Sequence, residues 1–61
     1  MNSKVINNFC RKYNIWIYIN TNMNKYFVTQ NDVILYQSSD YQDCEDYITE
    51  MIINDKHANN R

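Results

Sequence analysis

The chain has 61 residues, a formal net charge of −1, and neither glycine nor proline. A domain of this size buries only about 60% of its unfolded surface, so we expect one thin core in a single domain, 1–61. The lack of glycine excludes glycine-rich phosphate loops, and no stretch approaches the roughly 20 apolar residues of a membrane span. Other residues must make the turns, and the eleven asparagines tolerate left-handed backbone best.

The charges are segregated along the chain. Residues 1–25 carry only basic charges, whereas residues 32–55 carry all seven acids and no base. This pattern predicts either internal complementarity between the two parts or a face of one sign for a charged partner.

The first expected element is a short helix over 3–13. An apolar stripe runs through it at helical spacing: Val5, Ile6, Phe9, Cys10 and Tyr13. Asn2 or Ser3 can cap its start. Asn14 is suited to end it in place of glycine.

Three strands are expected next, over 15–20, 25–30 and 33–37. In the first, the isoleucines 15, 17 and 19 face one way, and Trp16 and Tyr18 face the other. Segments 21–24 and 31–32 are expected to be turns with asparagine at the left-handed positions. Connections this short predict an antiparallel meander.

A long helix is expected over 39–55. Five apolar residues fall on one of its faces: Tyr41, Cys44, Ile48, Met51 and Ile52. Ser39 and Gln42 have the spacing of a capping box. The polar tail, 56–61, is expected to fray.

The order is therefore α-β-β-β-α, an α+β fold with both helices packed on one face of the meander. The other face is expected to carry alternate strand residues, among them Trp16, Tyr18, Phe27 and one set from 33–36. Because both faces of the first strand are apolar, the sequence leaves open which face the helices cover. Such an open aromatic face is a candidate surface for a partner or for a second copy.

We expect no enzyme, no metal site and no cofactor. Two distant cysteines and His57, expected to be a solvated residue at the helix end, do not supply the ligands of a zinc site. Cys10 and Cys44 fall at apolar helix positions, where burial raises the thiol pKa and makes the thiol inert. No secretory signal is visible, so we expect a cytoplasmic chain with reduced thiols, with a Cys10–Cys44 disulfide as the alternative.

Four acids of the long helix form a negative row beside its apolar face, the acidic stripe: Asp40, Asp43, Asp46 and Glu50. Side chains three or four apart lie about 5–6 Å from each other at Cβ, similar to the spacing of phosphates along a strand. The acidic stripe can therefore occupy a basic groove on a host protein. The alternative is a solvated face that the helix dipole stabilises.

This layout resembles small phage proteins that block host defence, some of which share the α-β-β-β-α order and acidic surfaces. The resemblance implies an accessory protein that binds and inhibits or modulates a host protein. We predict that the acidic stripe steers the encounter and that Trp16 and Tyr18 anchor the complex.

Two other hypotheses remain open. The first is a nucleic-acid-binding regulator that uses the basic first half, Lys4, Arg11, Lys12 and Lys25, with nearby aromatic side chains. Few cations and many acids make this less favoured. The second is a structural homodimer formed through the open face of the sheet.

Overall fold

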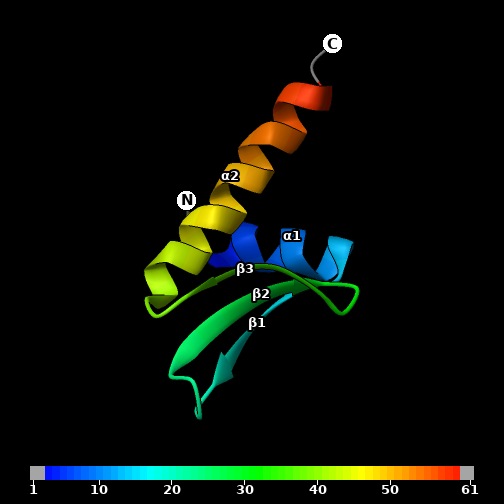
Figure 1. The fold of residues 1–61 in the computed structure, drawn as a ribbon. Coiled ribbons are helices and arrows are strands. Elements are labelled where there is room, and N and C mark those ends of the chain that lie inside the picture. Colours follow the sequence, from blue (N-terminus) through cyan, green and yellow to red (C-terminus); the bar gives the residue numbers. More distant parts are fainter. Residues whose placement is uncertain (1–2, 60–61) are drawn as a thin grey trace.

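The computed structural model describes residues 3–59, with the side chains of 3–56. It contains α1 (Ser3–Tyr13), β1 (Ile15–Asn20), β2 (Lys25–Gln30), β3 (Val33–Ser38) and α2 (Tyr41–Asn59). The strands form one antiparallel sheet in the order β1-β2-β3. Figure 1 shows both helices on the same face of this sheet. The predicted α+β fold and the α-β-β-β-α order are confirmed.

One small core joins the helices to the sheet. Its buried residues are Ile6 of α1, Ile15 and Val28 of the sheet, and Cys44, Ile48 and Ile52 of α2. The three α2 residues are spaced by four, so they share the helix face that is pressed onto the strands. The inward direction predicted for this apolar face is confirmed for these three residues and for Met51, which packs against the core partly buried, whereas Tyr41 is 45% exposed.

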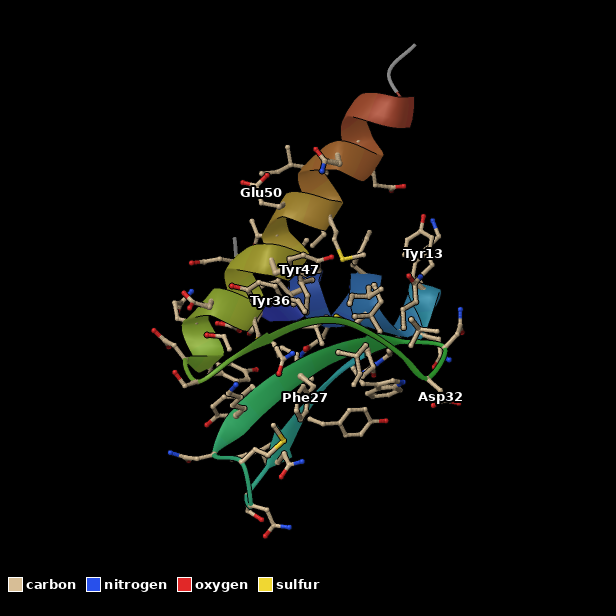
Figure 2. The ribbon with its side chains drawn as sticks, in the orientation of Figure 1. Tyr13, Phe27, Asp32, Tyr36, Tyr47 and Glu50 are labelled. Atoms are coloured by element: carbon tan, nitrogen blue, oxygen red, sulfur yellow. The ribbon has the colours of Figure 1, made fainter. Side chains whose placement is uncertain are left out.

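An aromatic pair ties α2 to the strand beneath it. The rings of Tyr36 on β3 and Tyr47 on α2 stack at 4.7 Å between centroids and 6° between planes, and Figure 2 shows them between helix and sheet. Tyr26 on β2 meets Tyr41 edge to face at 5.4 Å. Such pairs add about 0.5–1.5 kcal/mol beyond the burial of their area, which matters in a core this thin.

Asparagine and aspartate take the positions where glycine is usual. Positive φ angles occur at Asn14 (57°), Asn24 (54°), Asn31 (51°) and Asp32 (68°). The first ends α1, the second closes the β1–β2 loop, and the last two form the β2–β3 turn. The predicted role of asparagine in these turns is confirmed, and short polar side chains reduce the cost of left-handed backbone by bonding locally.

The start of α2 differs from the prediction. The capping box between Ser39 and Gln42 does not form; instead Asp40 caps the helix, because its Oδ1 accepts the backbone N–H of Gln42 at 3.0 Å. The Gln42 side chain donates to Asp46 at 3.0 Å. The helix therefore begins at Tyr41, two residues later than predicted.

The ends of β3 and α2 also lie beyond their predicted limits. β3 includes Ser38, whose hydroxyl accepts the backbone N–H of Asp40 at 3.1 Å and donates to Asp43 at 2.8 Å. The helix continues past Asp55 to Asn59. The last two residues of the tail expected to fray, like the Asn2 cap, lie outside the described residues.

Replacing Asp32 by glycine tests the backbone at the β2–β3 turn. Asp32→Gly keeps Asn31 and creates the Asn-Gly pair that two-residue hairpins favour. Glycine removes the Cβ penalty at φ 68°, so we expect the free energy of unfolding to rise by a few tenths to about 1 kcal/mol in urea titrations. Asn22→Gly is the control: Asn22 does not have positive φ, so glycine there should lower stability. Equal effects of both changes would contradict this explanation.

Candidate interaction surfaces

The acidic stripe lies on the outer side of α2. Asp43, Asp46 and Glu50 fall within an arc of about 60° at 100° per residue, opposite to the buried direction marked by Ile48. These three side chains are exposed, as is Asp40. Figure 2 shows Glu50 projecting sideways from α2, clear of the sheet. The helix therefore presents carboxylates on one side while its other side packs in the core.

The hydrogen-bond partners of these carboxylates are neutral groups. Asp40 accepts a backbone N–H, Asp43 the hydroxyl of Ser38, and Asp46 the amide of Gln42. Neutral donors orient a carboxylate without cancelling its charge. Internal complementarity between the two halves of the chain, one of the interpretations of the charge pattern, is not seen in these contacts.

The open face of the sheet carries aromatic residues. Strand pairing places Trp16 opposite Thr29 and Tyr18 opposite Phe27 on one face, and Figure 2 shows Phe27 on the side away from the helices. Trp16 and Tyr18 are 51% and 52% exposed. The alternation predicted for β1 is thus confirmed, and both residues are accessible to a partner.

Two asparagines hold the indole of Trp16 in place. Its Nε1–H donates to Oδ1 of Asn14 at 2.9 Å, and Nδ2 of Asn14 donates to Oδ1 of Asn31 at 2.9 Å. This short chain of bonds links the end of α1 to the β2–β3 turn. The indole is therefore oriented before any partner arrives, which lowers the entropic cost of using it as an anchor.

The two predicted groups of site residues lie on different sides of the molecule. The acidic stripe is on the outer side of α2. Trp16 and Tyr18 share the sheet face of Phe27, which Figure 2 shows on the side away from the helices. A single flat partner surface cannot cover both. They are two surfaces, not one composite site.

Among the residues that the structure describes, Lys25 is the one cation on the aromatic strand face, whereas the sequence named it only as one of four cations of the basic first half. Lys25 shares the parity of Phe27 along β2 and pairs with Asn20, so it lies on the open face. Lys4, Arg11 and Lys12 are exposed on α1 instead. Counting positions across the β1–β2 hairpin would have found Lys25, because residue parity fixes the face.

Two surface hollows flank α1. One of about 280 Å³ lies between α1, β1 and the start of α2, where Cys10, Arg11, Tyr41 and Glu45 contribute to its lining. Another of about 380 Å³ lies near Tyr13, between α1 and the second half of α2. Burial raises the pKa of Tyr41, and the charge of Glu45 adds to this rise.

Both cysteines are free. Cys44 is fully buried, with its Sγ 3.9 Å from the carbonyl oxygen of Tyr26, while Cys10 is half-buried. Burial raises the pKa of each thiol, and the nearby carboxylates of Asp43 and Asp40 add to the rise at Cys44. The raised thiol pKa predicted from their apolar positions is confirmed.

Within the described part of the chain, no group of three or more His, Cys, Asp or Glu side chains is arranged to hold a metal ion. The side chain of His57 lies outside the described residues. Neither described helix is long and apolar enough to cross a membrane.

Comparison of the chain with protein-family models, with curated proteins and with solved structures finds no match.

The different burial of the two thiols predicts two rates of labelling by a thiol reagent. Cys10 should react within the native state, and Cys44 only when the domain unfolds, so Cys10→Ala should leave only the slow phase. Rapid native labelling of Cys44 would contradict its burial.

The raised thiol pKa values predict how stability depends on pH. Folded-state thiol pKa values lie above those of the unfolded chain, so the unfolded state loses its thiol protons first as pH rises. The free energy of unfolding should therefore fall above about pH 8.5.

Proposed function

We propose that this protein acts stoichiometrically by binding a basic surface of another protein through the acidic stripe. The observation that carries this proposal is the exposed row of Asp43, Asp46 and Glu50 on the side of α2 opposite the core. Because the bonding partners of Asp43 and Asp46 are neutral, their charges remain available to attract a cationic groove.

A row of carboxylates on a rigid helix fits a groove that normally receives phosphates. Occupying such a groove would block nucleic-acid binding by the partner. This is the action expected of a cytoplasmic, phage-type accessory protein that inhibits or modulates a host protein. This proposed role is directed at a host protein and requires no catalysis by this chain.

We assign the aromatic residues a different part from the one predicted. Trp16 and Tyr18 share the sheet face of Phe27, which lies on the side away from α2 (Figure 2). We therefore assign electrostatic steering and docking to the acidic stripe alone. The open face is left for a separate contact.

Charge reversal at Asp46 or Glu50 tests the acidic stripe. Asp46→Lys and Glu50→Lys should each reduce protein capture from a lysate of the producing or host cell, and with a purified captured partner should slow association several-fold while dissociation changes little. Added salt should weaken capture by the wild type. Both residues are exposed, so the fold should persist.

The matched control combines Asp32→Asn with Asn22→Lys, in two loops away from the acidic stripe. It changes the net charge by the same amount as one reversal, and asparagine suits the positive φ of position 32. Equal loss of capture by the control and by the α2 variants would show that only overall charge matters, and unchanged capture by the α2 variants would refute the proposal.

A second candidate function, binding of single-stranded nucleic acid, is favoured by one observation. Three aromatic side chains, Trp16, Tyr18 and Phe27, share the open face with Lys25. Aromatic stacking contributes about 1–3 kcal/mol per base, and a nearby cation attracts the backbone. The acidic stripe lies on the other side of the molecule, so its repulsion of a polyanion on this face is weakened by distance and screening.

Fluorescence of Trp16, the only tryptophan, tests this candidate directly. Oligo-deoxythymidine should quench its emission at low salt, and Lys25→Ala should weaken binding and reduce the salt slope by about 1. Lys4→Ala, on the exposed side of α1, is the control and should bind like the wild type. No quenching, together with no gel shift of single- or double-stranded probes, would remove the candidate.

A further inference from the structure

Within the described residues no strand pairs with the outer edge of β1, because β1 is an edge strand in the order β1-β2-β3. The backbone N–H of Asn31 donates to the carbonyl of Asn14 at 3.3 Å. This bond shows which backbone groups of β1 point toward β2. Antiparallel pairs alternate between bonded and non-bonded positions. The backbone groups of Trp16 and Tyr18 therefore face β2, whereas those of the isoleucines 15, 17 and 19 point to the open edge.

The two edges of the sheet differ in how they are protected. On β3, Ile34 pairs with Thr29 and Tyr36 with Val28, so Leu35 is an extra residue. Such a bulge twists a strand and discourages pairing with another chain. The pairing of β1 with β2 is regular, and the β1 sequence IWIYIN contains no charge and no proline. It therefore lacks these devices against edge-to-edge association.

We propose that β1 pairs antiparallel with β1 of a second copy of this chain, about a two-fold axis at Ile17. Two three-stranded sheets then become one continuous sheet of six strands. Ile17 faces Ile17 of the second copy, Ile15 faces Ile19 of the second copy, and Trp16 faces Tyr18 of the second copy. The helices of both copies lie on the same face of the combined sheet.

The strand is complementary to itself in this register. The isoleucines 15, 17 and 19, whose backbone N–H and C=O groups point to the open edge, all become hydrogen-bonded positions. Trp16 and Tyr18 meet at the non-bonded positions, where side chains come closest. Aromatic and β-branched pairs of this kind are the favourable cross-strand pairs. An axis at Tyr18 would instead set Trp16 against Asn20 and leave Ile15 without an isoleucine partner. Ile15–Asn20 itself carries no charge, although Arg11 of α1 lines the same hollow as Ile15 and Ile17.

The size of the contact predicts a dissociable dimer. Six residues at about 3.3 Å each make an edge about 20 Å long. A contact along this single strand edge is too small to bury the roughly 800 Å² per partner of a standard interface. Dimerisation would nevertheless cover Ile19, which is 57% exposed on the helix-covered face, beside the buried Ile15 of the second copy. We therefore expect association between micromolar and millimolar concentrations.

Three lysine variants, studied by sedimentation over that concentration range, separate the possible contacts. Ile19, Val33 and Ile34 are 57%, 61% and 58% exposed, so each tolerates a charge in the monomer. Ile19→Lys, on β1, should raise the dimer dissociation constant by at least about tenfold. Val33→Lys on the β3 edge and Ile34→Lys on the open face introduce the same charge and should leave dimerisation unchanged.

Amide hydrogen exchange in the wild type gives a measure that needs no variant. The N–H groups of Ile17 and Ile19 should exchange rapidly in dilute solution and become protected by at least about tenfold where the dimer forms. A monomer at all concentrations, or a dimer without protection of these amides, would overturn the proposal. So would a dimer that Ile34→Lys or Val33→Lys dissociates, because the contact would then be face to face or through β3.

Discussion

The packing of α2 on the sheet is the contact on which the remaining structure depends. Cys44 and Ile48 are fully buried against the strands, where Ile15 and Val28 are fully buried as well. Each large apolar side chain buried in this way contributes about 1.5–3 kcal/mol, and the core has few others. Rotating α2 about its axis would expose this row and turn the carboxylates toward the sheet. The position of the core therefore fixes the outward direction of the acidic stripe.

The same core sets the faces of the strands. Successive strand side chains alternate between faces, so burial of Ile15 and Val28 leaves Trp16 and Phe27 on the other side. The sequence contains this information because alternation and helical spacing are different periods, and each stretch of the chain matches only one of them. The order of elements and the two faces of β1 were predictable for this reason, and the left-handed asparagines were predictable because the chain has no glycine. Which face of the sheet is open was not predictable, because both faces of β1 are apolar.

Other features depend on choices that the sequence leaves nearly equal. Three adjacent residues, Ser38, Ser39 and Asp40, are all of types that favour the cap position. Asp40 becomes the cap because the chain leaves β3 at Ser38, whose hydroxyl accepts the Asp40 N–H, and Asp40 then accepts the N–H of Gln42. The extra residue in β3 and the difference between the two sheet edges arise from strand pairing, which local periodicity does not specify. The separation of the acidic stripe from Trp16 and Tyr18 depends on how α2 is placed on the sheet, and a linear chain does not reveal that placement.

The length of α2 shapes how the molecule moves through water. Its 19 residues extend about 28 Å at 1.5 Å per residue, and Figure 1 shows its second half rising clear of the strands. The overall dimensions are 43 × 22 × 17 Å. A body of this form meets more friction than a sphere of equal mass, so it diffuses more slowly than its 7.5 kDa would suggest. It also spins about its long axis faster than it tumbles end over end.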